Sequence, residues 1–191
     1  MVDVHQGRFV LPATIGMPAT KKELNADAMK RISDWILSQE IPCDITVCVG
    51  GVSFPVHKFP LVSKCGYIKK LLSDTKNTDL SVVEIPDVPG GPEGFELAAK
   101  FCYETNIGLS TENIAVARCV AEYLEMTEKY ATGNLVSITE AYLNDTGLTN
   151  LSRVASILQS SGNLLPISDK VKLIDRCICF QWNPEAEYDF Y

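Results

Sequence analysis

The chain has 191 residues, of which 46% are hydrophobic and 21% are charged, and its net charge is −7. This is the composition of a globular protein with enough apolar surface to form a core. The acidity excludes nucleic-acid binding as the expected function, because phosphate contacts need clustered Lys and Arg and the longest basic cluster is Lys69-Lys70.

The N-terminal region is predicted to be a tail followed by a helix. Residues 1–25 show no hydrophobic periodicity and lack the apolar stretch of a signal peptide, so we expect a flexible tail. A helix is predicted over residues 26–38, and Pro42 disfavours helix just after it. Its apolar stripe consists of Met29, Ile32 and Ile36, with Trp35 beside it.

Two alternating runs on either side of Gly50-Gly51 predict a β-hairpin. The alternating apolar residues are Ile45, Val47 and Val49 before the glycines and Val52, Phe54 and Val56 after them. Helical spacing then resumes through Leu61, Cys65, Ile68 and Leu72. After a polar segment, "VVEIPDV" predicts a third strand and "PGGPEG" predicts a turn.

Only helices are predicted beyond this turn. Their expected apolar faces are Phe95, Ala98, Ala99 and Cys102; Val116, Cys119, Val120, Tyr123 and Leu124; Leu135, Ile138 and Tyr142; Leu151, Val154, Ala155 and Leu158; and Val171, Ile174 and Ile178. Ser168 is a candidate N-cap for the last helix. Glu122, Glu125 and Glu128 are interpreted as a solvated acidic face.

The order of these elements predicts an α+β fold, in which a small sheet is capped by a helical cluster. Strands do not alternate regularly with helices, so a doubly wound nucleotide-binding fold is not expected. We divide the chain into a tail (1–25), a mixed domain (26–132) and a C-terminal helical extension (133–191). No apolar run approaches the ~18 residues that span a membrane, so no membrane insertion is expected.

The seven cysteines are expected to be reduced. Their number is odd, their spacing fits no disulfide framework, and most fall on predicted apolar faces. His57 and Cys65 have the side chains of a nucleophilic pair, but Cys65 belongs to an apolar helical face and His57 ends a strand. Cys177 and Cys179 would point ~200° apart on a helix and could not hold one zinc ion. We therefore expect an intracellular protein with no catalytic residue, no metal site and no cofactor.

Several motifs together carry a family likeness. The segments "CDITVCVGGVSFPVHKFPLVSKCGYIKKLL", "VVEIPDV" and "FELAAKFCYET" resemble a BTB/POZ domain that runs from about residue 26 to residue 130. "IPDVPGGPEGFELAAKFCYE", "ENIAVARCVAEYLEMTEKY" and "NLLPISDKVKLIDRCI" extend the likeness to the plant phototropism-adaptor family, known for nonphototropic-hypocotyl and root-phototropism proteins. With "FPVHKFPLVSKCGYIKKL" and "NLVSITEAYL", the motifs of this plant family span residues 54–179. The BTB/POZ likeness implies the BTB/POZ fold.

The resemblance implies a homodimeric adaptor that recruits substrates to a cullin-RING ubiquitin ligase in light and auxin signalling. The implied partners are a second copy, the third class of cullin, and a substrate or photoreceptor-type signalling protein. Asp44 and Lys58 match positions that lie near each other at the dimer surface of such domains. The stripe formed by Met29, Ile32, Trp35 and Ile36 completes the expected dimer interface, because an apolar helix outside the core needs a partner.

The expected cullin-facing residues only partly match the family pattern. Strong cullin adaptors carry a hydrophobic residue and a Glu two positions later between the helix and the third strand. Here the corresponding residues are Thr75, Lys76 and Asn77, so both anchor positions depart from the pattern. Tyr103 matches an aromatic that faces the cullin in those adaptors. Cullin binding is therefore expected to be weaker than in the strongest adaptors.

Other functions stay open from the sequence alone. The alternatives are a BTB scaffold or transcriptional co-regulator without a ligase role, and a tetramerisation cap resembling that of potassium channels. An enzyme is the alternative from a different class. The expected location is the cytoplasm, with the nucleus or the surface of the plasma membrane reached through partners.

Overall fold

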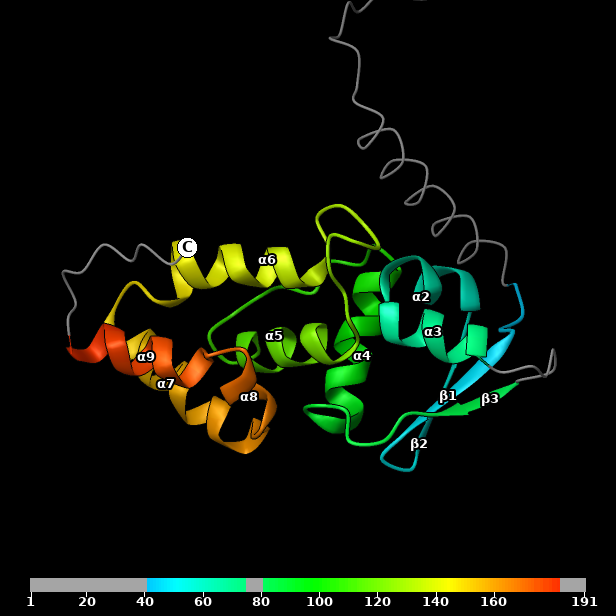
Figure 1. Ribbon diagram of the computed structural model, residues 1–191, viewed down its shortest axis with the longest axis horizontal. Coiled ribbons are helices and arrows are strands. Elements are labelled where there is room, and N and C mark those ends of the chain that lie inside the picture. Colours follow the sequence, from blue (N-terminus) through cyan, green and yellow to red (C-terminus); the bar gives the residue numbers. More distant parts are fainter. Residues whose placement is uncertain (1–40, 75–80, 183–191) are drawn as a thin grey trace, which may run out of the picture.

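The computed structural model describes residues 41–74 and 81–182 (Figure 1). The tail and the helix predicted over residues 26–38 lie outside this part of the chain. A small sheet lies at one end of the molecule with α2, α3 and α4 beside it, while α7, α8 and α9 lie at the opposite end (Figure 1). The helix α5 runs between these two groups, so the molecule is α+β as the sequence predicts.

The sheet has the strand order β2-β1-β3. The strands β1 (Ile45–Val49) and β2 (Val52–Val56) form the predicted hairpin, with Val49 paired to Val52. Gly50 and Gly51 both have positive φ angles, 54° and 81°, a conformation that glycine adopts without steric cost. The third strand is also confirmed, as β3 (Val82–Glu84), and it runs parallel to β1.

The single helix predicted after the hairpin is wrong, because two helices occupy this region. They are α2 (Lys58–Lys64) and α3 (Gly66–Asp74), separated by the extended backbone of Cys65. The amides of Gly66 and Tyr67 donate to the Glu125 and Leu124 carbonyls instead of to α2. Contacts with a distant segment therefore interrupt a helical pattern that is continuous in the sequence, although Cys65 is buried as expected.

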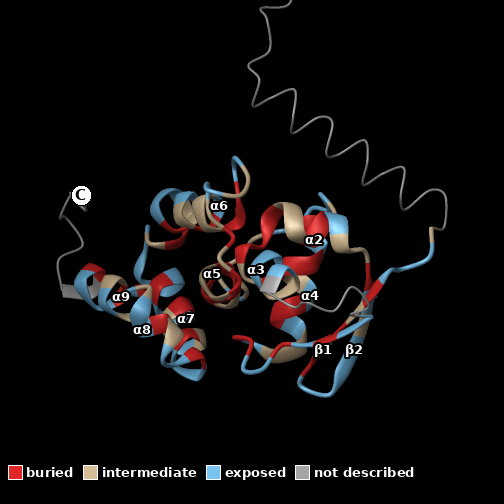
Figure 2. Cartoon of the chain, turned by 45° about the vertical axis from the view of Figure 1, so that its right-hand side comes forward, coloured by how far each residue is buried: buried red, intermediate tan, exposed pale blue. Residues whose placement is uncertain are grey.

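The first core lies between the sheet and the helices α2, α3, α4 (Gly91–Cys102) and the C-terminal half of α5 (Ile114–Tyr123). The face predicted for α4 is confirmed, since Phe95, Ala98, Ala99 and Cys102 are all buried. Buried residues are concentrated where these helices face one another and the sheet (Figure 2).

The C-terminal helices are present, but the sequence placed their buried faces only partly correctly. They are α6 (Leu135–Tyr142), α7 (Leu151–Ser161), the short α8 (Ile167–Lys170) and α9 (Leu173–Trp182). Ile138, Leu151 and Ile178 were expected inside but are exposed. Leu135 on α6 and Val154 on α7 are buried as predicted. Residues that the sequence did not predict are also buried: Thr139 on α6, Ile157 on α7, and Leu173, Cys177 and Phe180 on α9.

The start of the last helical region also differs from expectation. Ser168 was the candidate N-cap, but Pro166 occupies the N-cap position of α8 and Ser168 is buried within that helix. The short helix therefore begins before the predicted residue. Local sequence preference did not locate this helix end, because the packing of α8 against α5 and α9 decides which residues are helical.

The helix α5 belongs to two cores. Its C-terminal residues Val120 and Ala121 pack into the first core. Its N-terminal residues Ile114, Ala115 and Cys119 pack into a second core with Val154, Ile157, Leu164, Leu173, Cys177 and Phe180. The helices after residue 142 therefore close on a helix of the mixed domain and do not form a separate unit.

A charged network joins the same elements. Arg118 on α5 donates from Nε to Glu140 Oε1 on α6 (2.6 Å), and Arg176 on α9 donates to Glu140 Oε2 (2.8 Å). Burial alone would raise the pKa of Glu140, but the hydrogen bond from Arg118 and the charges of both arginines hold that pKa below its ordinary value. One carboxylate thus links three helices.

The prediction of one solvated acidic helix face holds only in part. Glu128 is exposed as expected, but α5 ends at Tyr123, so only Glu122 belongs to that helix, and all three carboxylates have partners. Glu122 pairs with Arg118 and Lys170. Glu125 pairs with Lys70 of α3, and this hydrogen bond is the main reason that the pKa of Glu125 is lowered. Glu128 accepts hydrogen bonds from Asn134 and Ser137. These residues are spaced like a helix surface, but they hold neighbouring segments in place.

Replacing Glu140 by Gln is expected to lower the free energy of unfolding by about 1–3 kcal/mol at neutral pH, since a partly buried carboxylate between two arginines loses its charge. The pKa of Glu140 is lower in the folded than in the unfolded protein. The carboxylate therefore stabilises the fold at pH values above its ordinary pKa, and this stabilisation is lost as the pH falls through the folded pKa. Urea unfolding monitored by circular dichroism should give a larger free energy of unfolding for the wild type than for the variant. This difference should become smaller at acidic pH.

Glu96→Gln is the matched control for this change, because Glu96 forms an exposed pair with Lys100. Its effect should stay within about 0.5 kcal/mol. Equal unfolding curves for the Glu140 and Glu96 variants would contradict a stabilising role for the network.

Candidate interaction surface

Asp44 and Lys58 lie together, as the resemblance implies. The Lys58 backbone N–H donates to Asp44 Oδ1 (2.7 Å). Lys58 is the first residue of α2, and the N-cap residue His57 makes no side-chain hydrogen bond to that helix end. The exposed Asp44 carboxylate therefore satisfies a backbone donor at the positive end of the helix. That the pair forms part of a dimer interface stays a prediction.

Phe59 is a surface residue that sequence reasoning missed. Its side chain follows Lys58 on α2 and is 46% exposed, which is large for an aromatic residue. The sequence did contain a signal, because Phe59 falls outside the apolar stripe that begins at Leu61. An exposed aromatic ring next to Asp44 and Lys58 supplies the apolar contact that a protein interface needs.

His57 is hydrogen-bonded on every side. Its backbone N–H donates to Tyr103 Oη (2.8 Å), and its ring Nδ1 lies 2.8 Å from the same oxygen. Its ring Nε2 lies 2.9 Å from the carbonyl oxygen of Ile41. The histidine thus connects the segment before β1 with the end of α4, and both ring nitrogens are used in that connection.

Tyr103 occupies the C-cap position of α4 and is half-buried. Burial raises the pKa of Tyr103 above its ordinary value, against the opposing effect of the hydrogen bond from the His57 backbone. The hydroxyl group is therefore directed to the junction at His57, which leaves the ring as the part that could meet a partner. The role of Tyr103 in cullin contact stays a prediction.

The other predicted interface residues lie outside the described part of the chain. These are Met29, Ile32, Trp35 and Ile36 for the dimer, and Thr75, Lys76 and Asn77 for the cullin. Their expected roles rest on the sequence.

Lys64 is a second residue that sequence reasoning missed. It is buried at the end of α2, where its ammonium group pairs with Glu104 and donates to the Phe101 carbonyl oxygen (3.2 Å). The same ammonium lies 4.4 Å from the centre of the Phe101 ring. The Lys64 carbonyl accepts from the buried Asn134 (2.9 Å). This lysine therefore fixes the end of α4, including the neighbourhood of Tyr103.

The candidate nucleophile and its candidate base have other partners. Cys65 Sγ lies 3.6 Å from Cys102 Sγ, while the ring of His57 bonds Tyr103 and Ile41. The hydrogen bond with Cys102 and then burial raise the pKa of Cys65 well above its ordinary value, so the reactive thiolate is disfavoured. Cys177 is buried and Cys179 is exposed, so the two thiols lie on different sides of α9 as predicted.

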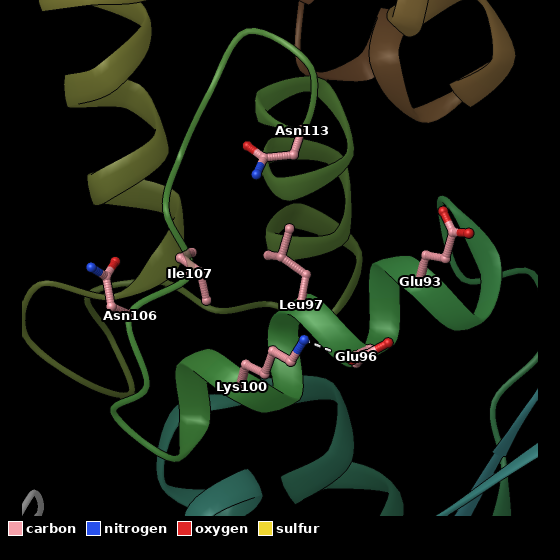
Figure 3. Close-up of a pocket in the computed structure, with 7 residues that line it drawn as sticks. All are labelled: Glu93, Glu96, Leu97, Lys100, Asn106, Ile107 and Asn113. Atoms are coloured by element: carbon pink, nitrogen blue, oxygen red, sulfur yellow. Dashed lines mark ion pairs between the residues drawn. The ribbon is translucent and has the colours of Figure 1, made fainter.

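A small pocket lies between α4 and the segment that leads to α5 (Figure 3). Its volume is about 280 Å³, and Leu97 and Ile107 form its apolar part. Glu93, Glu96 and Lys100 supply charged walls, and the Glu96 carboxylate pairs with Lys100 (2.7 Å; Figure 3). No group of three or more His, Cys, Asp or Glu side chains suited to a metal ion occurs in the described ranges 41–74 and 81–182.

Comparison with known proteins assigns a family to this arrangement. The sequence profile of the BTB/POZ domain matches residues 35–146, which include the sheet, the helices α2–α6 and the surface around Asp44, Lys58 and Tyr103. The chain belongs to the BTB/POZ family. A BTB/POZ domain is a protein-interaction module, and this is the general function of the domain.

Two relatives of this chain are plant proteins. BTB/POZ domain-containing protein SR1IP1 of Arabidopsis thaliana is 58% identical over 163 residues, covering 85% of this chain and 27% of that protein. Root phototropism protein 2 of A. thaliana is 40% identical over 166 residues, covering 87% of this chain and 28% of that protein. The second match supports the resemblance to the phototropism-adaptor family. The chain spans about a quarter of the length of these curated relatives.

Among solved structures, the BTB domain of zebrafish PATZ1 matches with a TM-score of 0.48 and 18% sequence identity, covering 69% of this chain and all of that one.

Within the described residues, no helix has the length and the apolar composition needed to cross a membrane.

Iodoacetamide is expected to label the native chain first at the exposed Cys43 and Cys179. Cys65, Cys102, Cys119 and Cys177 should react only after unfolding, because burial shields them and, for example, raises the pKa of Cys119 to about 12. Peptide mass spectrometry at successive times measures each rate. Fast labelling of Cys65 in the folded protein would contradict this assignment and favour an enzyme.

Proposed function

We propose that the chain is a homodimeric adaptor that presents a bound protein to a cullin-RING ubiquitin ligase in plant light or auxin signalling. The observation that carries the proposal is the BTB/POZ domain itself, matched over residues 35–146, with an exposed aromatic residue beside its Asp44–Lys58 pair. The resemblance to phototropism adaptors supplies the signalling context.

Dimerisation is supported by the start of α2. Phe59 offers an apolar contact, and the neighbouring residues Asp44 and Lys58, which are joined through the Lys58 backbone N–H, carry side chains of opposite charge. A two-fold axis would bring the same patch of each copy to the other, so Asp44 of one chain could meet Lys58 of the next. The predicted stripe of Met29, Ile32, Trp35 and Ile36 would enlarge this contact.

Cullin binding is supported by Tyr103 and opposed by Thr75 and Asn77, which depart from the family pattern. The C-terminal helices compensate in this proposal by extending the adaptor surface. The second core supports this role of the C-terminal helices. In that core they pack against Ile114, Ala115 and Cys119 of α5, which holds the proposed extension against the BTB/POZ domain. We propose residues 1–25 as a tail, 26–132 as the BTB/POZ domain and 133–191 as this extension.

Phe59→Asp is expected to weaken the dimer at least tenfold, since the charge would be buried against an apolar partner surface. Light scattering over a micromolar concentration series measures the mass. Ile32→Asp, on the predicted stripe, should act in the same direction. Leu165→Asp is the matched control, because Leu165 is 60% exposed and lies among the C-terminal helices.

The mass of the unmutated chain decides the first part of the proposal. A dimer that survives Phe59→Asp would move the interface elsewhere. A monomer at all concentrations would exclude the homodimeric adaptor.

Calorimetry with the N-terminal region of a class-three cullin tests the second part. Tyr103→Ala should weaken binding about tenfold, because an aromatic anchor is lost. Thr75→Met combined with Asn77→Glu should tighten it, because the double change restores the apolar anchor and the carboxylate of the family pattern. A dimer that binds no cullin would favour the alternative of a scaffold or co-regulator without a ligase role.

A further inference from the structure

We infer that His57 is a positioning residue that holds the two candidate surfaces in place through two separate hydrogen bonds, one for each surface. The Nε2 bond serves the segment that carries Asp44, and the Nδ1 bond serves Tyr103. This inference rests on the proposed function, because it concerns the surfaces expected to meet a second copy and a cullin.

The segment from Ile41 to Asp44 is held at both ends by neighbouring residues of one junction. His57 Nε2 bonds the Ile41 carbonyl (2.9 Å), and the Lys58 backbone N–H bonds the Asp44 carboxylate (2.7 Å). Residues 41–44 precede β1 without regular secondary structure, so no ladder of backbone hydrogen bonds fixes them. Loss of the Nε2 bond would free the end of the segment nearest Ile41.

The donors and acceptors around the ring can be assigned. A carbonyl oxygen only accepts, so Nε2 carries the proton that is donated to Ile41. In the neutral ring Nδ1 is then an acceptor, and the Tyr103 hydroxyl donates to it. The same hydroxyl oxygen accepts from the His57 backbone N–H. The Tyr103 hydroxyl thus both donates and accepts at one residue, which fixes the direction of its ring.

Two substitutions separate the bonds, because each keeps one function of the ring. Asn at position 57 places an acceptor oxygen near the position of Nδ1 but does not reach Ile41. Gln places a donor NH₂ near the position of Nε2 but leaves the Tyr103 hydroxyl without its acceptor. His57→Asn should therefore preserve the orientation of Tyr103, and His57→Gln should preserve the segment at Ile41.

The test measures two quantities for each variant of the 191-residue chain: the dissociation constant of the dimer and the affinity for the cullin N-terminal region. His57→Gln should weaken binding of the cullin N-terminal region about fivefold and leave the dimer constant within about twofold. His57→Asn should do the reverse. Tyr103→Phe should weaken cullin binding at least as much as His57→Gln, because it removes the Nδ1 bond and also the bond from the His57 backbone N–H. The double variant should be no weaker than Tyr103→Phe alone, since the Nδ1 bond is already absent there.

Tyr123→Phe is the control for the loss of a hydroxyl group, because Tyr123 bonds the Pro86 carbonyl (2.5 Å) away from this junction. It should change neither constant. Circular dichroism melting of every variant identifies any that fail to fold. If His57 only stabilised the fold, each variant would weaken dimerisation and cullin binding together. Weaker cullin binding in His57→Gln alone and a weaker dimer in His57→Asn alone cannot arise from such a role.

The outcomes are distinct. If the unmutated chain dimerises and binds the cullin but the two His57 variants behave alike, this inference is overturned and the proposed function stands. If the unmutated chain does neither, the proposed function is overturned and this inference with it. Nitrogen NMR of the His57 ring provides an independent reading, because Tyr103→Phe should shift Nδ1 and leave Nε2 unchanged; an unshifted Nδ1 overturns the inference in either case.

Discussion

The arrangement of the described sheet and helices depends on the sharing of α5 between two cores. One end of this helix packs against α6 and the first core, and the other end packs against the C-terminal helices. This is possible because α5 buries seven of its ten residues, including Arg118. Arg118 is accommodated because Glu122 and Glu140 neutralise it. The BTB/POZ domain and the helices α7, α8 and α9 that follow it are therefore held together by apolar packing and by charge.

Buried and hydrogen-bonded residues also hold the two helix ends that form the candidate interaction surface. The end of α4 is fixed by Lys64, which satisfies Glu104 and the Phe101 carbonyl, and by Tyr103, which bonds His57. The start of α2 is fixed by Asp44. A surface built in this way loses little conformational freedom when a partner binds, and preorganisation of this kind favours affinity. The residues with polar side chains at the junction act as supports, while Phe59 remains exposed to a partner.

The stretch of His57, Lys58 and Cys65 illustrates how chemical residue types can mislead. These side chains have the chemistry of a catalytic site, but tertiary contacts give each of them another role. His57 connects two segments, the Lys58 backbone is capped by Asp44, and Cys65 lies against Cys102 at the break between two helices. The sequence predicted that Cys65 is buried, yet the break itself could not be predicted, because it depends on carbonyl groups about sixty residues further along the chain, at Leu124 and Glu125.

The sequence by itself determined the hairpin, the third strand, the buried face of α4 and the family likeness, because alternation, paired glycines and helical spacing are local signals. Only the tertiary structure decided which faces of the C-terminal helices are buried. Ile138, Leu151 and Ile178 are as apolar as the buried aliphatic residues, but the neighbouring helices cover only one side of each helix: α5 packs on α6 and α7, while α7 and α8 pack on α9. The ion pairs of Glu122 with Lys170 and of Glu140 with Arg118, and the contact between His57 and Tyr103, were decided in the same way. Each joins residues that are brought together only when separate helices and strands pack, and no spacing along the chain records that proximity.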